Sequence, residues 1–272
     1  MWFWHIFKDP LQKITEVPFE YFGPIGVLCI VPQPLWRFIY ATDFLSALKL
    51  TMLAGLALLV LGIGPFRSIA IFTCLLLTFY QGLIRGFGYI NHGELPMLYA
   101  AYVLAAFPSA HALSLRRGQI DRAHPVMYQA PMMAIGLLLA VTYTFVAARR
   151  LAEGGLEVFT NGTIIHMIAL RSFEPGPSGT GYGYVVLEYP WLALMIQVGF
   201  PIVTIFELLS PLCLFYRRFR WAWILIISAF HVATGLFMQI WFTANFFLIL
   251  VFLTDIDRLL AAWLPYPVSE NS

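Results

Sequence analysis

Long apolar runs separated by short charged or proline-containing turns dominate the chain. A membrane helix needs about 20 mostly apolar residues, with a usual range of roughly 17–25. Runs of this kind predict about seven spans, at 42–63, 66–84, 95–113, 125–148, 190–215, 221–238 and, shorter, 241–254. The short loops predict antiparallel neighbours within one bundle. The expected fold class is an all-α integral membrane protein, a polytopic bundle of about seven transmembrane helices with an N-terminal interfacial segment.

Two stretches near the N-terminus depart from this pattern. The opening "MWFWHIF" places bulky aromatic side chains before the first charges, which suits an amphipathic anchor in the membrane interface. Three prolines break the run 22–35, which we expect to be interfacial or re-entrant. We therefore expect an interfacial segment over 1–39, the transmembrane bundle over 40–255 and a C-terminal tail over 256–272.

The stretch 149–188 is too polar and too rich in glycine to span a membrane, and we expect an extramembrane loop there. A short helix is predicted within it, over 161–173, with Asn161 able to cap its start. Its expected apolar face consists of Ile164, Ile165, Ile168 and Leu170. The glycines of "GPSGTGYGY" make the following residues a connector or a lid over a site.

Composition strengthens the membrane interpretation. The 272 residues are 60% hydrophobic and only 11% charged, whereas about a quarter of an ordinary soluble domain is charged. The lipid bilayer is thus the expected partner, and the expected location is integral to a membrane, the inner membrane in a bacterium. The net charge of +2 comes with arginines scattered in short clusters, so no nucleic acid is expected as a partner. The three cysteines lie far apart and predict buried thiols rather than a disulfide framework.

Three ionisable residues inside the apolar runs are candidates for chemistry, because a charge near a helix centre costs at least about 2.5–3.5 kcal/mol. Lys49 is either a snorkelling side chain, a partner of Glu207, or a general base, since desolvation favours the neutral amine. Glu207 is either a hydrogen-bonding anchor inside the bundle or a catalytic acid or base. His231 is either a satisfied interior histidine or a functional one.

Polarity concentrates again in "QGLIRGFGYINHGELP", residues 81–96. Arg85, Asn91, His92 and Glu94 stand there between two apolar runs, and Pro96 suits the first turn of a helix. The stretch is either a solvated turn or a helix entry that sets His92 and Glu94 at the membrane boundary. A histidine at such a point can act as a base or orient a ring hydroxyl.

Metal binding is not expected, although the residue types would suit iron or zinc. The four candidate ligands are His92, Glu94, Glu207 and His231. Neither HExxH nor Glu-x-x-His occurs among them, and these are the spacings that set two ligands on one helix face.

Three ordered stretches carry a resemblance to a known family. They are "YINHGELPMLYAAYVLAAFPSAHALSL" (89–115), "RRLAEGGLEVFTNGTI" (149–164) and "FELLSPLCLFYRRFRWAWILIISAFHVATGLFMQIWF" (206–242). Together they resemble the HTTM superfamily, the membrane domain of vitamin K-dependent γ-carboxylase and its small bacterial relatives, over most of 40–255. The resemblance implies functional roles for His92 with Asn91 beside it, for the Phe-His histidine His231, and for the acidic helix residue Glu207.

The chain departs from the family at one important position. The carboxylase deprotonates vitamin K hydroquinone with a lysine downstream of the basic-Leu motif. After the pair Arg149-Arg150 and before the run that starts at 190 this sequence has no lysine, only Arg171, which cannot act as a base. Lys49 lies in another run, so the family's role does not transfer to it. Glutamate carboxylation itself is therefore not the expected reaction.

Three functions follow as expectations. The first is a membrane enzyme that acts on a quinol or another lipid-phase substrate by proton abstraction or oxygenation-type chemistry, with a reduced quinone as a possible cofactor. Its candidate residues are His92, Lys49, His231 and Glu207 for catalysis, and Asn91, Glu94, Arg85 and Arg171 for substrate binding. The second is a non-enzymatic membrane factor for maturation, export or immunity of a secreted peptide, with a peptide or protein partner. The third is a small-molecule transporter.

Overall fold

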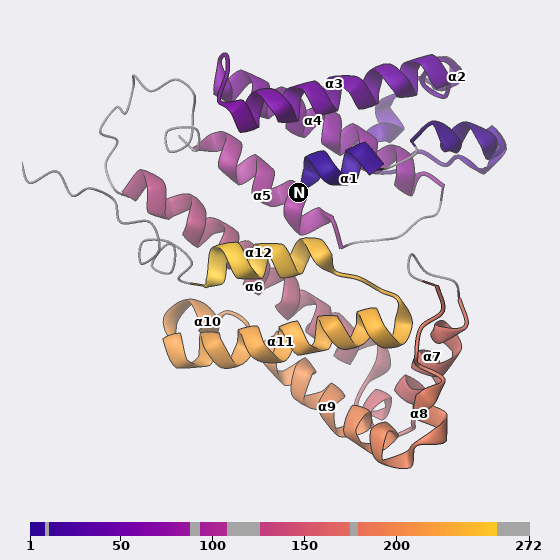
Figure 1. The fold of residues 1–272 in the computed structure, drawn as a ribbon, viewed down its shortest axis with the longest axis vertical. Coiled ribbons are helices and arrows are strands. Elements are labelled where there is room, and N and C mark those ends of the chain that lie inside the picture. The colour runs from indigo at the N-terminus through magenta and orange to yellow at the C-terminus, as the bar shows by residue number, and fades with distance from the viewer. Residues whose placement is uncertain (9–10, 88–92, 108–125, 175–178, 255–272) are drawn as a thin grey trace, which may run out of the picture. The chain divides into compact units, whose positions relative to one another are not determined.

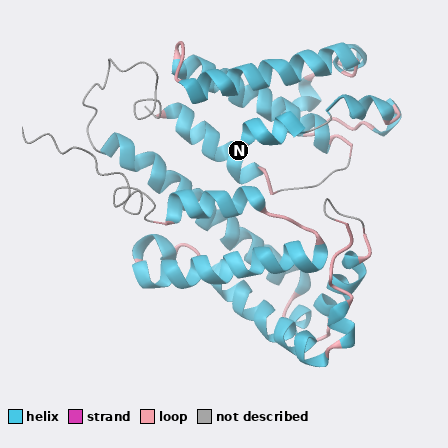
Figure 2. Cartoon of the chain, in the orientation of Figure 1, coloured by secondary structure: helices cyan, strands magenta, loops and turns pink. Residues whose placement is uncertain are grey.

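The computed structural model describes residues 1–8, 11–87, 93–107, 126–174 and 179–254 (Figure 1). Within these ranges the chain is mostly helical, with loops between the helices, and forms no strand (Figure 2). Five of the described helices are long and apolar enough to cross a membrane, which agrees with the all-α class predicted from the sequence. They are α3 (Thr42–Leu61), α4 (Phe66–Arg85), α6 (Val126–Gly154), α9 (Pro190–Leu208) and α11 (Arg217–Met238).

The chain divides into two compact units, Met1–Pro131 and Met132–Ser272. We call them unit 1 and unit 2 and describe each by itself. The division falls inside helix α6, where the sequence predicted no boundary. Pro131 marks the place, since a proline within a helix removes one backbone hydrogen bond and crowds the preceding turn.

In unit 1, helix α3 packs against α4, and α4 packs against α5 (Leu95–Ala106). Helix α1 (Trp2–Lys8) lies against α3 and is amphipathic as expected, because Trp2 and Ile6 are buried while Trp4 and Phe7 are exposed. The run 22–35, which the sequence predicted to be broken by its prolines, forms no long helix. The connecting elements are η1 (Leu11–Glu16), η2 (Phe19–Tyr21), η3 (Gly26–Ile30) and α2 (Gln33–Ile39).

The third predicted span is shorter than expected. Helix α5 ends at Ala106, where Phe107 takes an extended conformation, and residues 108–125 lie outside the described part of the chain. Twelve residues cover about 18 Å, less than the roughly 30 Å of a bilayer core. Its beginning matches the helix-entry interpretation, since Glu94 is the N-cap residue and Pro96 lies in the first turn.

In unit 2, the run predicted at 190–215 is not one helix. Helix α9 ends at Leu208 and a short helix α10 (Leu212–Phe215) follows, because Pro211 lacks the N–H that would continue the ladder. Two other helix bounds differ from the prediction. Helix α6 runs six residues past the predicted end at 148, and α11 begins at Arg217 instead of Trp221. The last apolar run forms α12 (Thr243–Leu253).

The core of unit 2 comes from residues spaced four apart. This spacing keeps side chains on one helix face. On α6 the buried row is Ile135, Leu139, Tyr143 and Ala147, and on α11 it is Trp223, Ile227, His231 and Gly235. The ring of Tyr143 meets those of Trp223 and His231, so the two rows face each other.

The predicted short helix is present as α7 (Thr163–Ser172), between η5 (Glu157–Phe159) and the short helix α8 (Val185–Glu188). The N-cap residue is Gly162 rather than the expected Asn161, although Asn161 Oδ1 accepts a 3.0 Å hydrogen bond from the Thr163 N–H. The predicted apolar face is wrong in one member. Ile168 is buried, but Leu170 is 71% exposed because two residues of helix turn it well away from Ile168.

Candidate functional site

Polar side chains gather in three places. The N-terminal cluster in unit 1 consists of His5, Tyr80, Gln81, Arg85 and Glu94. The Glu207 network in unit 2 consists of Thr144, Arg150, Thr204, Glu207 and Ser210. The His231 site, also in unit 2, consists of Tyr143, His231 and Asn245.

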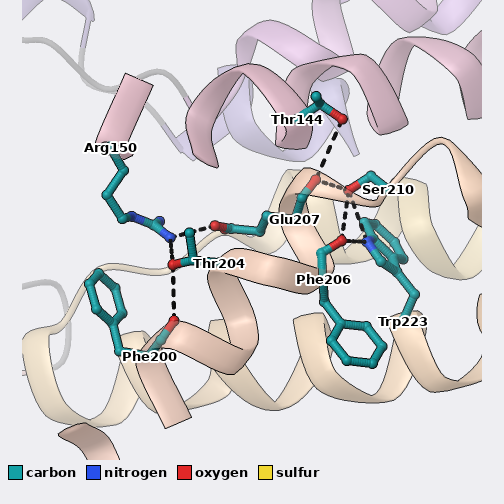
Figure 3. Close-up of polar contacts among 8 residues, drawn as sticks. All are labelled: Thr144, Arg150, Phe200, Thr204, Phe206, Glu207, Ser210 and Trp223. Atoms are coloured by element: carbon teal, nitrogen blue, oxygen red, sulfur yellow. Dashed lines mark hydrogen bonds and ion pairs between the residues drawn. The ribbon is translucent and has the colours of Figure 1, made fainter. Parts of the chain in front are cut away.

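The Glu207 network is built around a buried ion pair (Figure 3). Arg150 Nη1 lies 2.6 Å from Glu207 Oε2 and donates a second hydrogen bond, also 2.6 Å, to Thr204 Oγ1. Its guanidinium group lies over the ring of Phe200, 4.6 Å from the centroid. The extra turns of α6 beyond the predicted end make this possible, because they carry Arg150 alongside α9.

The same network closes the C-terminal end of α9, where backbone carbonyls have no partner within the helix. Ser210 Oγ donates to the carbonyl of Glu207 at 2.5 Å, and the indole N–H of Trp223 donates to Ser210 Oγ at 3.0 Å. Thr144 Oγ1 reaches the carbonyl of Glu207 from α6 at 3.5 Å (Figure 3). These bonds fasten the end of α9 to α6 and α11.

The contacts of Glu207 favour the anchoring interpretation over the catalytic one. Its carboxylate is 2% exposed and is held by Arg150, a partner that the sequence analysis did not name. The true partner was assigned to a loop because the apolar run stops before Arg150. Lys49 itself is half-buried on α3 in unit 1.

The His231 site lies among apolar and aromatic side chains. His231 is 5% exposed, and its Nε2 lies 2.5 Å from the hydroxyl oxygen of Tyr143. The side chain of Asn245, from α12, interacts with the same hydroxyl. The ring of Phe242 covers His231, with centroids 4.8 Å apart. Three helices therefore fix one imidazole in a defined orientation.

Three buried polar atoms beside this contact have no hydrogen-bond partner among the described residues. They are His231 Nδ1, Asn245 Oδ1 and Ser228 Oγ. Ser228 precedes His231 by three residues and so lies on the same side of α11. Each such atom costs about 1–3 kcal/mol when it stays unpaired. Their presence favours a polar group of a ligand as their partner.

The N-terminal cluster sits at helix ends. Glu94, at the start of α5, lies 3.0 Å from His5 Nε2 of α1 and accepts a 2.5 Å hydrogen bond from the side chain of Gln81. Arg85, the last residue of α4, donates to Gln81 Oε1 at 2.5 Å. The hydroxyl of Tyr80 is 3.5 Å from His5 Nε2. The cluster joins α1 to the α4–α5 turn.

Electrostatics keep Glu94 ionised. Burial acts to raise the pKa of its carboxyl, but the hydrogen bond and charge of His5, the hydrogen bond from Gln81 and the charge of Arg85 outweigh burial and lower that pKa. Glu94 therefore acts as a charged acceptor that holds the histidine and the glutamine in place.

The structure brings together two of the predicted binding residues, Arg85 and Glu94, through Gln81. Asn91, also predicted to bind substrate, and His92, predicted to be catalytic, lie outside the described residues, so their roles stay predictions.

The remaining candidate for substrate binding, Arg171, has a different setting. It forms an ion pair with Glu174 three residues later, and both side chains are largely exposed.

Within the described residues no group of three metal-ligating side chains is present. The expectation of three buried thiols is wrong for Cys29, which is exposed, while Cys74 and Cys213 are buried.

Several site residues were missed by sequence reasoning. Tyr143 and Asn245 are neutral polar residues inside apolar runs, where only ionisable residues were weighed. Gln81 was missed for the same reason. His5 was assigned to the interfacial segment and Arg150 to a loop. A search for every hydrogen-bonding side chain inside the predicted spans would have found the first three.

No protein-family model matches the chain, and no curated protein or solved structure matches it. The resemblance to the HTTM superfamily therefore stays a prediction.

Proposed function

We propose that the chain is an integral membrane protein of about seven spans and that its five long apolar helices cross the bilayer. The exposed side chains of these helices support this, because they are as apolar as a core. On α9, for example, Leu194, Met195 and Val198 are all more than half exposed. In water such a surface would be an aggregation site, whereas acyl chains solvate it well.

Within that frame we propose an enzyme that withdraws a proton from a hydroxyl group of a quinol or another lipid-phase substrate. The His231 site carries this proposal. A buried imidazole held at Nε2 by Tyr143 presents Nδ1 as the nitrogen for a substrate hydroxyl. The proton moves from the hydroxyl oxygen to Nδ1 and leaves an oxyanion. The Asn245 amide and the Ser228 hydroxyl are the groups available to orient that ring.

The family resemblance enters the proposal through the same histidine. His231 occupies the Phe-His position of the third motif, in the middle of a long apolar helix. The family's lysine has no counterpart at the corresponding place, so the proposal assigns the base to an imidazole. An imidazole can take this role because its neutral ring has one nitrogen that accepts a proton.

The test is turnover of vitamin K hydroquinone by the protein in lipid nanodiscs, followed by chromatography of the quinol and its products. We expect His231→Gln to lower the rate by about 10²-fold or more, the usual contribution of a positioned base. His166→Gln is the matched control, because His166 is an exposed histidine on α7 and its loss should leave the rate unchanged. A wild-type protein that neither binds nor consumes the quinol, but copurifies with a peptide, would support the non-enzymatic function instead.

A second variant tests the predicted role of His92. We expect His92→Ala to abolish turnover while the protein still inserts and folds, since the resemblance makes this histidine functional. Size-exclusion chromatography and helical content by circular dichroism report on folding. Unchanged activity would remove His92 from the site.

A further inference from the structure

Helix α7 carries apolar side chains on two faces. Ile168 and Ala169 are buried against the rest of unit 2, as one face of a short amphipathic helix should be. The outward side is apolar as well, with Leu170 71% exposed and Phe173, just after the helix, 65% exposed. A loop in water would be expected to present polar residues there.

The exposed apolar surface continues from α7 through α8 to α9. Helix α8 packs against both neighbours. Leu187 and Trp191 are 57% and 61% exposed. The exposed aromatic residues of this stretch are Tyr182, Tyr184, Tyr189 and Trp191. On α9, Trp191 shares one helix face with Leu194, Met195 and Val198, the exposed residues assigned above to the acyl chains, because spacings of three and four keep side chains on one side.

The backbone fixes this surface at the ends of two long helices. The N–H groups of Tyr182 and Gly183 donate to the carbonyls of Leu236 and Phe237, at 3.0 Å each, near the C-terminal end of α11. A Cβ on Gly183 would overlap the carbonyl oxygens of Ile168 and Phe237, so the connector is packed too closely there to act as an open lid. Helix α9 begins at Pro190, directly after α8.

We propose that the α7–α8 segment, residues 163–174 and 179–189, lies in the headgroup region of the bilayer and binds lipid. This rests on the proposed insertion of α9 and α11. Ten residues of α7 span about 15 Å, half of a bilayer core, so the helix lies along the surface. Tyrosine and tryptophan favour this depth. Arg171 and Glu174, which pair at the surface, reach the headgroups from there. The stretch expected to be an extramembrane loop is thus an interfacial one.

The test uses one fluorescent reporter at a time, a nitrobenzoxadiazole group on an introduced cysteine. The background is Cys29→Ser, which removes the exposed thiol and keeps the two buried ones. The three reporter positions are Leu170→Cys on α7, Val198→Cys within α9, and Glu153→Cys near the end of α6. Proteoliposomes of phosphatidylcholine and phosphatidylglycerol carry a nitroxide at acyl carbon 5 or carbon 12, and iodide is added from the aqueous phase.

We expect the reporter at position 170 to be quenched at least twofold more by the shallow nitroxide than by the deep one. The reporter at position 198 should show the reverse order, and the one at 153 should respond mainly to iodide, because that side chain is 65% exposed and charged in the native protein. Iodide quenching at 170 equal to that at 153 would overturn the proposal. Protection at 170 from all three quenchers would also overturn it, in favour of a covering protein.

The reporter at position 198 distinguishes a failure of the interfacial placement from a failure of the proposed membrane insertion. Weak nitroxide quenching at 198 would contradict membrane insertion itself, whereas deep quenching there with an aqueous response at 170 would contradict only the interfacial placement. Phe173→Cys gives an independent reading of the same surface, and we expect it to follow position 170.

Discussion

The two units place their polar groups in opposite ways. The N-terminal cluster of unit 1 joins the start of one helix and the end of another, and its ionic contact between His5 and Glu94 is partly exposed. In unit 2 the Glu207 network and the His231 site lie inside the helix packing, with Glu207 and His231 almost fully buried. A partly exposed charge keeps part of its solvation, whereas a fully buried one depends on its protein partners.

This difference distinguishes polar groups that hold helices together from those that are candidates for binding a ligand. The charged groups of the N-terminal cluster and the Glu207 network are matched by opposite charges or by hydrogen bonds, and they hold helices together. The His231 site gathers three of the six buried polar side-chain atoms of the described residues for which no hydrogen-bond partner is found. Structural polar networks are normally fully satisfied. Because no other place gathers as many of these atoms, the His231 site is the candidate for binding.

The largest effect that this comparison predicts is the loss of Arg150. Arg150→Ala leaves the Glu207 carboxylate buried without its cation, and we expect the free energy of unfolding to fall by about 3–5 kcal/mol. The measurement is reversible unfolding in mixed micelles. The neighbouring Arg149 is the control, since it pairs with Glu153 on the exposed surface and its replacement should change stability by less than about 0.5 kcal/mol. Equal effects of the two variants would contradict a buried ion pair.

A smaller effect is expected from overpacking next to the His231 site. Gly235 lies one turn after His231, and a Cβ there would stand 2.5 Å from the Trp241 ring. We expect Gly235→Ala to lower the free energy of unfolding by about 1–3 kcal/mol.

The comparison variant is Gly199→Ala on α9, where a Cβ meets no atom within 4 Å. Alanine is the better helix former by about 1 kcal/mol, so this variant should be neutral or more stable. If both glycines tolerated alanine equally, the close packing around the His231 site would be refuted.

The smallest effect belongs to the N-terminal cluster. Glu94→Gln keeps the shape and removes the charge, and we expect a loss of about 1 kcal/mol or less at neutral pH because the pair is partly exposed. The folded-state pKa of Glu94 is lowered, so its contribution to stability is complete above the ordinary value near 4.3 and is lost as the pH falls through the lower folded-state pKa.

A pH series of unfolding measurements on the wild type and Glu94→Gln checks that prediction. The difference in stability between the two proteins should shrink as the pH falls from about 4 through the lower folded-state pKa, below which the wild-type carboxyl is protonated in both states. A difference that grows on acidification would mean that the carboxyl is held in its protonated form in the folded state.

Much of the fold could be predicted from the sequence, because the length of each apolar run indicates a long helix. The ends of the helices were harder to predict. Arg150 lies in a helix that outlasts its apolar run, and Pro211 divides a run that hydropathy alone joins. Tertiary partners decide such boundaries, since the last turns of α6 are stabilised by the ion pair they form with α9.

The candidate site was predictable only in part. His231 stood out as an ionisable residue inside an apolar run. Tyr143 did not, because tyrosine is common in membrane helices and only the facing of two buried rows reveals its contact with His231. The partner of Glu207 was equally hidden, since pairing across 57 residues depends on how α6 and α9 pack.

The most direct test of the His231 site is photoaffinity labelling with a ring-azido naphthoquinol in nanodiscs, followed by mass spectrometric mapping of the adducts. We expect adducts on α6, α11 and α12 near Tyr143, His231 and Asn245, removed by an excess of unlabelled quinol and weakened at least tenfold in His231→Gln. Competed labelling confined to the α4–α5 turn of unit 1, or labelling that excess quinol does not reduce, would contradict the site.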